Sequence, residues 1–258
     1  MSGTEFGGRI ALVTGAAGGI GRAVVGRLRA GGARVVAADL PSAALDALAV
    51  PDAVRVEPLD VTDSNAVEAL FTRIEAEWGP VDLLASLAGV LKTGTIAETS
   101  DEDWRRHFAV NTDGVFHLGR AAARRMGARR RGAIVVVSSN AGGVPRQGMG
   151  VYATSKAAAT MLTRCLGLEL APLGVRCNVV APGSTLTPML TGMWDDPNDP
   201  DAPARIIAGS PETFRLGIPL GKLGTPDDVA EAVAFLLSDR AAHITMGELY
   251  VDGGAALR

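Results

Sequence analysis

Tyr152 and Lys156 stand four residues apart in an alanine-rich stretch with helical spacing. On a helix, this interval puts both side chains on one face. A free phenol has a pKa of about 10, and a neighbouring ammonium favours its ionised form. The pair is therefore a candidate for acid–base chemistry, although a Tyr/Lys pair at this spacing is also common on helix surfaces.

Ser139 and Asn111 are candidates for the same site. Ser139 ends the apolar run GAIVVVSS, and a loop of twelve residues separates it from Tyr152, so its hydroxyl can return beside the phenol. Asn111 is a polar residue among apolar ones in FAVNTDG. Taken alone, Ser139 is also typical of an ordinary turn, and Asn111 of a helix residue whose side-chain hydrogen bonds are made within the fold. Together with Tyr152 and Lys156, they predict a catalytic set.

A glycine-rich turn, TGAAGGIG, follows the apolar run RIALVT near the start of the chain. Glycines let the chain turn tightly and bring backbone N–H groups close to a pyrophosphate, and the helix that follows presents its positive N-terminus to that charge. A glycine-rich loop without a ligand is the alternative. The candidate dinucleotide-binding residues of this turn are Gly15, Gly18, Gly19, Ile20 and Gly21.

Two acidic residues end the next two apolar runs. Asp39 is placed to accept hydrogen bonds from the adenosine ribose and to repel a 2′-phosphate, which predicts NAD rather than NADP. The alternative is that Asp39 caps the helix that starts near residue 42. Asp60 and Val61 are candidates for the adenine edge, although Asp60 is also suited to capping the turn after it.

The elements that must position these residues alternate between strand and helix. The apolar runs are continuous, which indicates strands covered on both faces, and the alternation predicts a doubly wound parallel sheet. We therefore expect an α/β fold of about seven strands with helices on both faces. The expected strands are 9–14, 33–39, 54–60, 81–89, 132–139, 174–183 and 248–254, and the expected helices 20–31, 42–49, 65–78, 101–127, 151–171 and 226–237.

Residues 184–216 lack a clear pattern and follow the sixth expected strand. Ligands bind beyond the carboxyl ends of such strands, and long loops in compact domains tend to be functional or disordered. We therefore predict a substrate lid here in preference to a floppy insertion.

Composition excludes several classes of protein. With 25 basic and 28 acidic residues the net charge is −3, which argues against nucleic acid as the main partner, and the arginine run 124–131 is interpreted as a helix end. The two cysteines, Cys165 and Cys177, make neither a disulfide framework nor a metal site, and are expected in the core. No apolar run reaches the roughly 18 residues of a membrane span, and no signal peptide is evident, so we expect a cytoplasmic protein.

These motifs together resemble the short-chain dehydrogenase/reductase family. The resemblance extends from Arg9 to Gly254, and it rests on TGAAGGIG, Asp39, Asp60-Val61, Asn111, Ser139, Tyr152-x-x-x-Lys156 and Pro182-Gly183. It implies one Rossmann-type dehydrogenase domain over residues 1–258. The sequence departs from the family after the fourth strand, where Ser86-Leu87-Ala88-Gly89 replaces an asparagine-rich segment.

The resemblance also implies roles. Tyr152 would be the acid/base, Lys156 would hold the nicotinamide ribose, and the main chain of Asn111 would position a water of a proton relay. Thr187 would contact the carboxamide. The further residues assigned to the cofactor are Ala88, Gly89, Pro182, Gly183 and Thr185.

Three segments carry a finer resemblance, to NAD-dependent family members that oxidise 2,3-dihydro-2,3-dihydroxybenzoate for siderophore or secondary-metabolite biosynthesis. They are PRQGMGVYATSKAA, GVRCNVVAPGSTLTPM and the chain from LGIPLGKLG to the C-terminus. The oxidised ring becomes a catechol, and aromatisation drives the reaction. A carboxylate needs a cation, and Arg146, six residues before Tyr152, is the candidate. Met149 and Met189 are candidates for the apolar wall, or else core residues.

Three alternatives stay open. An enzyme of 2,3-dihydro-3-hydroxyanthranilate would share the chemistry. A generic ketoreductase is disfavoured by Asp39, and a non-catalytic NAD-binding scaffold by the intact catalytic set. The resemblance further implies a homotetramer through the helices at about 101–127 and 151–171.

Overall fold

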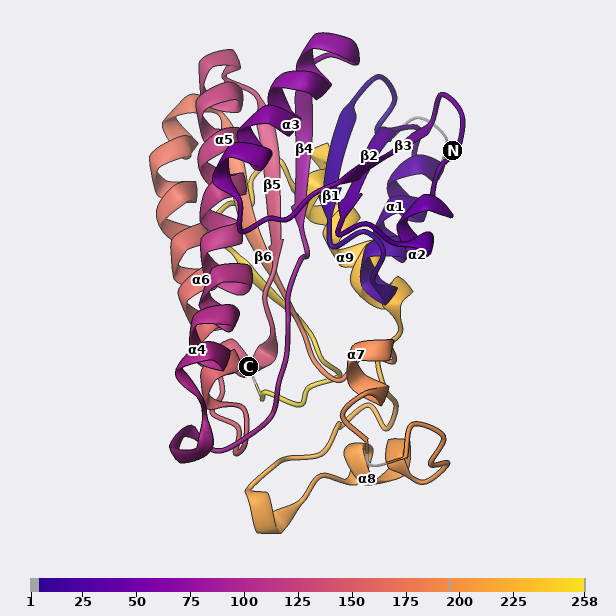
Figure 1. Ribbon diagram of the computed structural model, residues 1–258, viewed down its shortest axis with the longest axis vertical. Helices are drawn as coiled ribbons and strands as arrows, with labels where there is room; N and C mark the ends of the chain where they lie inside the picture. The colour runs from indigo at the N-terminus through magenta and orange to yellow at the C-terminus, as the bar shows by residue number, and fades with distance from the viewer. Residues whose placement is uncertain (1–4, 195, 258) are drawn as a thin grey trace.

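A parallel sheet of seven strands forms the centre of the computed structural model, which describes residues 5–194 and 196–257 (Figure 1). Its order is β3-β2-β1-β4-β5-β6-β7, and every neighbouring pair is parallel. The strands are β1 Ile10–Thr14, β2 Arg34–Asp39, β3 Val54–Pro58, β4 Val81–Ser86, β5 Gly132–Val137, β6 Val175–Pro182 and β7 Glu248–Val251. The predicted α/β fold class is confirmed.

The strand order reverses between β1 and β4. The chain moves outward from β1 to β2 and β3, then returns to the other side of β1 to begin β4. Loops that leave these two central strands therefore separate at the carboxyl edge and open a crevice for a ligand there. All five residues of β1 are buried, as its continuous apolar pattern requires.

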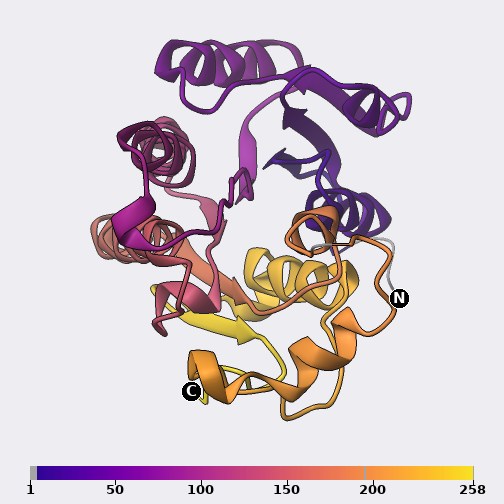
Figure 2. The same cartoon turned by 60° about the horizontal axis from the view of Figure 1, so that its bottom comes forward.

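Helices cover both faces of the sheet, as Figure 2 shows from the lower end of the molecule. Helices α1 and α9 pack on one face, and α3, α5 and α6 on the other, so that each face has its own hydrophobic core. The helices are α1 Gly19–Ala30, α2 Ala43–Asp46, α3 Ser64–Glu77, α4 Asp101–Phe108, α5 Gly114–Arg129, α6 Gly150–Leu170, α7 Pro188–Thr191, α8 Ala202–Ala208 and α9 Pro226–Leu237.

Three expectations need correction. The region 101–127 is not one regular helix, because a π-helix, Ala109–Asp113, separates α4 from α5. The segment 184–216 is not wholly irregular, since it contains α7 and α8. Cys165 is exposed on α6 rather than in the core, whereas Cys177 is buried.

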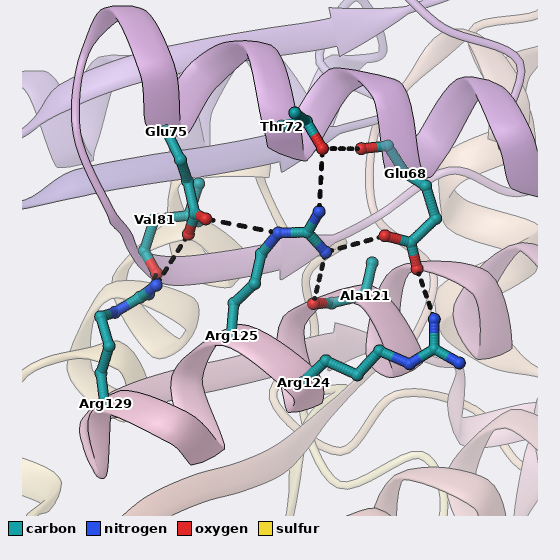
Figure 3. A network of polar contacts seen from close by, with 8 residues as sticks. All are labelled: Glu68, Thr72, Glu75, Val81, Ala121, Arg124, Arg125 and Arg129. Atoms are coloured by element: carbon teal, nitrogen blue, oxygen red, sulfur yellow. Dashed lines mark hydrogen bonds and ion pairs between the residues drawn. The ribbon is translucent and has the colours of Figure 1, made fainter.

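The arginine run 124–131 is more than a solvated helix end, because three of its arginines bind carboxylates on α3 (Figure 3). Arg125 reaches Glu68 at 2.8 Å and Glu75 at 3.3 Å. Arg124 adds a contact of 3.2 Å to Glu68, and Arg129 one of 2.7 Å to Glu75. The Arg125 hydrogen bond holds the pKa of Glu68 below its usual value. The network holds α5 against α3, on the face of the sheet that also carries α6.

Among the described helices, none combines the length and the apolar character that a membrane crossing needs.

Candidate active site

A cavity of about 350 Å³ opens at the carboxyl edge of the sheet. It lies among the loops that follow β4, β5 and β6 and the start of α6. The predicted site residues along its wall are Ile20, Gly89, Ser139, Arg146, Met149, Tyr152, Lys156, Pro182, Gly183, Thr185, Thr187 and Met189. A hollow of about 560 Å³ lies at the opposite edge, beside the starts of β4, β5 and β6, and contains none of these residues.

Ser139 and Tyr152 meet inside this cavity, and both are 8% exposed. Tyr152 lies in the first turn of α6, which fixes its direction. Ser139 follows β5 and caps the 3₁₀ turn Asn140–Gly142, where its Oγ accepts a hydrogen bond from the Ala141 N–H at 3.2 Å. The loop between β5 and α6 thus returns the chain so that the serine and the phenol share one hydrogen bond.

Burial dominates the protonation of Tyr152 in the chain by itself. It raises the pKa of the phenol, and the hydrogen bond with Ser139 acts in the opposite direction. The Lys156 Nζ is 5.8 Å from the centre of the Tyr152 ring, and burial lowers the pKa of Lys156 to about 8.

Lys156 is 5% exposed and held at its tip. Its Nζ donates to the Val137 carbonyl at 3.1 Å, at the end of β5. Gly89 borders the same nitrogen, since a Cβ at this glycine would be 3.2 Å from Nζ. Lys156 therefore stands between the ends of β4 and β5, beside the phenol.

Asn111 is fully buried in the π-helix. Its side chain accepts from the Val90 N–H at 2.9 Å and donates to the Val90 carbonyl and to Ser155 Oγ, both at 3.0 Å. It therefore ties the loop after β4 to helix α6. Single-turn π-helices are frequent at functional sites because they redirect a side chain or a backbone group out of the regular ladder.

The glycine turn after β1 has the tight packing that its sequence predicts. A Cβ at Gly21 would be 2.1 Å from the Gly15 carbonyl oxygen, and one at Gly15 would be 2.6 Å from the Ala88 backbone nitrogen. Gly15 also has a φ of +67°, a conformation that favours glycine. No side chain caps the N-terminus of α1 at Gly18, so the first turn of that helix is left for a ligand.

Asp39 ends β2 directly beside this turn. One of its carboxylate oxygens accepts from the Ala17 N–H at 2.9 Å and the other from the Leu40 N–H at 2.8 Å. Its carboxylate supports the turn and does not cap the helix near residue 42, where Ser42 is the cap. Asp60 Oδ1 accepts from the backbone N–H and the hydroxyl of Thr62, so Asp60 does cap the turn after β3.

Val61 and Gly19 lie at two sides of the crevice. The Val61 carbonyl is bound to the His117 ring at 3.0 Å, and its side chain is buried against Gly114. A Cβ at Gly19 would be 2.8 Å from Thr187 Cγ2. The start of α1 therefore contacts the segment after β6, and this contact brings Thr187 over the dinucleotide turn.

The cavity is lined by apolar and cationic side chains. The predicted substrate-binding residues Met149, Met189 and Arg146 are among them. Arg215 and Ile206 line the same cavity and were missed. Both lie in the predicted lid segment, where a search for a second cation gives two arginines, Arg205 and Arg215, and only the fold brings Arg215 to the cavity.

Known proteins resemble this chain along its whole length. The sequence profile of a family described as "Enoyl-(Acyl carrier protein) reductase" matches residues 15–256. This chain is a short-chain dehydrogenase/reductase. A 2,3-dihydro-2,3-dihydroxybenzoate dehydrogenase of Bacillus subtilis (strain 168) is 49% identical, with 97% of each chain covered. A vibriobactin-specific 2,3-dihydro-2,3-dihydroxybenzoate dehydrogenase of Vibrio cholerae is 41% identical, with 95% of each covered.

Solved structures agree on the fold of this short-chain dehydrogenase. A putative gluconate dehydrogenase from Agrobacterium tumefaciens superposes with a TM-score of 0.88 at 29% identity, covering 97% of each chain. The short-chain dehydrogenase is thus an oxidoreductase that uses a nicotinamide cofactor. The open N-terminus of α1 and the glycines that leave room beside it fit the pyrophosphate of such a cofactor.

Proposed function

We propose that this enzyme oxidises 2,3-dihydro-2,3-dihydroxybenzoate to 2,3-dihydroxybenzoate with NAD, in siderophore or secondary-metabolite biosynthesis. The observation that carries the proposal is one cavity that is lined both by the Ser139–Tyr152 pair and by Arg146. An alcohol and a carboxylate on one small ring would meet these two groups together. The names of the relatives at 49% and 41% identity support the same substrate.

In the proposed reaction, Ser139 and Tyr152 hold the ring hydroxyl. The hydroxyl proton passes to the Tyr152 oxygen while the carbinol C–H bond breaks, and the oxidised nicotinamide, when bound, accepts the hydride. The resulting ketone tautomerises to the catechol, since a ring carbon loses a proton and the ketone oxygen gains one, and this aromatisation makes the overall oxidation favourable. Because burial raises the pKa of Tyr152, the phenolate needs positive charge beside it, and the Lys156 ammonium is placed to supply it.

Replacing Tyr152 by Phe tests this assignment. The variant should lose at least about 1000-fold in kcat, as expected for removal of a general base, while NAD affinity stays within about twofold. Tyr250→Phe is the matched control, because Tyr250 is the other tyrosine of the chain and lies on β7 outside the cavity. NADH formation at 340 nm is the measurement. Full turnover by the Tyr152 variant would refute the mechanism.

We propose NAD rather than NADP because of Asp39. Its carboxylate stands at the dinucleotide turn, where it would repel a 2′-phosphate. Asp39→Asn removes the charge and keeps an oxygen that can accept from the Ala17 N–H. The variant should lose most of the preference for NAD over NADP, which is measured as kcat/KM with NAD divided by kcat/KM with NADP. An unchanged ratio would contradict this assignment. If Asp39→Ala fails to fold while Asp39→Asn folds, the hydrogen bond from the Ala17 N–H is shown to be needed for the turn itself.

The proposed lid is the segment 184–216. Its support is that Ser184, Thr185, Thr187, Met189 and Leu190 line the cavity, as do Met193, Trp194, Ile206 and Arg215 further along. Limited proteolysis with and without NADH and 2,3-dihydroxybenzoate tests it, because a lid should become protected when both ligands are bound. Equal cleavage rates in all states would exclude ligand-dependent closure.

We further propose a homotetramer that associates through α5 and α6. A groove of about 280 Å³ lies between these helices, and Phe116, Met161 and Leu168 on them are exposed. Exposed apolar side chains on paired helices suit a symmetric interface. Light scattering after size-exclusion chromatography distinguishes a mass of four chains from the 26.5 kDa monomer.

A further inference from the structure

The substrate cavity contains two arginines from separate parts of the chain. Arg146 comes from the loop between β5 and α6, and Arg215 from the segment between α8 and α9. Both are partly buried and line the same cavity. Two guanidinium groups in one small cavity repel each other and lose hydration, so their placement needs a physical reason.

Arg215 is held in place by a small antiparallel bridge. Ser210 and Arg215 exchange two backbone hydrogen bonds of 2.9 Å, and the Ile218 N–H binds the Ile207 carbonyl at 2.9 Å. Arg215 Nη2 then donates to Ser184 Oγ at 2.9 Å. These contacts hold the guanidinium at the cavity, next to the loop after β6, and the described residues provide no partner for its other N–H groups.

No carboxylate pairs with either arginine within residues 5–194 and 196–257. Asp252 is the acid whose field reaches Arg146, and its two oxygens are already bound to Asn140 Nδ2 and the Gly254 N–H, each at 3.0 Å. Burial lowers the pKa of both arginines, and Arg215 lowers that of Arg146 further. An anion between them would relieve both effects.

A third donor points to the same ligand chemistry. The Trp194 Nε1 is buried and has no hydrogen-bond partner among the described residues, and this tryptophan lines the same cavity. Buried donors without partners are uncommon in folded proteins and mark places where a ligand or water completes the structure. The cavity wall therefore offers donors in excess, which suits the four lone-pair sites of a carboxylate.

We propose that Arg215 binds the ring carboxylate together with Arg146, so that the segment 184–216 supplies half of the carboxylate site. This inference rests on the proposed function for the identity of the ring. It makes Arg215 a specificity-determining residue: rings with a carboxylate are bound, and neutral rings of the same shape lose the contribution of both guanidinium groups. The carboxylate also links the loop between β5 and α6 to the segment 184–216, which couples binding to the position of the segment.

The test measures binding without turnover. Calorimetry with the NADH-loaded enzyme compares 2,3-dihydroxybenzoate with catechol, which lacks the carboxylate, and benzoate with phenol. Arg215→Gln should weaken the two carboxylates about 10- to 100-fold, the range of a charged hydrogen bond, and leave catechol within twofold. Arg215→Lys should recover part of the affinity. Arg205→Gln removes the same charge from the same segment, in an exposed ion pair with Asp199, and should change nothing.

Each outcome of this experiment either supports the inference about Arg215 or overturns it. Carboxylate affinity unchanged in Arg215→Gln would overturn the inference, and so would an equal loss for catechol, because it would show a structural effect on the segment. Failure of the proposed function is separate: the wild-type enzyme would then not oxidise 2,3-dihydro-2,3-dihydroxybenzoate. Arg215-dependent binding of benzoate would in that case still assign a carboxylate site, for another ring.

Discussion

The packing of two glycines on α1 gives a sharp prediction about the dinucleotide turn. Gly21 and Gly26 are both in this helix, and both would gain helix propensity if replaced by alanine, worth about 1 kcal/mol each. Their surroundings differ. A Cβ at Gly26 would have nothing within 4 Å, whereas a Cβ at Gly21 would be 2.1 Å from the Gly15 oxygen and 2.7 Å from Ala16 Cα.

The expected effects have opposite signs. In Gly26→Ala the propensity gain stands alone, so the unfolding free energy should rise by about 1 kcal/mol and Tm by about 2–4 °C. In Gly21→Ala the turn must move by about 1 Å, because contacts to a Cβ below 3.0 Å do not occur. Such overpacking costs about 1–3 kcal/mol and leaves a net loss of up to about 2 kcal/mol.

The displaced turn should also weaken cofactor binding. Gly15 packs on the backbone of Leu87 and Ala88, so it has no free side to move into without opening the contact between β1 and β4. We expect NAD affinity to fall at least tenfold in Gly21→Ala, about 1.4 kcal/mol, and to stay unchanged in Gly26→Ala. Scanning calorimetry and NAD titration of both variants are the measurements. Equal Tm and equal Kd in the two variants would refute the packing argument.

Two further predictions concern buried polar groups. Asn111→Ala should lower the unfolding free energy by about 3 kcal/mol, because it leaves the Val90 N–H and carbonyl without partners, and it should also reduce kcat. Asn65→Ala is the control, because Asn65 is an exposed asparagine on α3, and it should lower neither quantity. Thermal unfolding and rate assays are the measurements. Lys156 should make stability rise by about 2 kcal/mol from pH 8 to pH 10, because its pKa of about 8 lies below the ordinary 10.5 and the unfolded chain binds more protons in that interval. Burial raises the pKa of Cys177 to about 12 and also raises that of Tyr152, and both act in the opposite direction over this interval. Urea unfolding should therefore show the rise as the difference in unfolding free energy between the wild type and Lys156→Met.

The sequence was sufficient for the fold because its patterns are local and consistent. Continuous apolar runs such as RIALVT can be buried on both faces, and each is followed by a helical pattern with an end signal. The glycine turn was equally readable, since its packing depends on residues close in sequence. The helix at 101–127 was misread, because one extra residue in a helical turn does not disturb the apolar period enough to reveal the π-helix around Asn111.

The candidate site was harder where distant segments meet. Ser139, Tyr152 and Lys156 follow one another closely, so a strand end and a helix start were enough to bring them together. Arg215 contacts Ser184, 31 residues away in the sequence. The antiparallel bridge between Ser210 and Arg215 that positions it leaves no periodic pattern in the sequence. The protonation of Tyr152 could not be inferred from spacing either, since burial by the whole fold raises the pKa of the phenol more than the Ser139 hydrogen bond lowers it.

Lysine suits position 156 better than arginine because the space there is small and because lysine has the lower pKa. The chain has 3 lysines among its 25 basic residues, so arginine is its usual cation. At this position the space admits only a small group such as an ammonium. The Val137 carbonyl oxygen is 3.1 Å from Nζ, and a Cβ added at Gly89 would be 3.2 Å from the same nitrogen. A planar guanidinium would collide with this boundary, and its much higher pKa would keep it charged at every working pH. Burial lowers the pKa of Lys156 to about 8, so its charge can change near working pH, which is the property a partner of a titrating phenol needs.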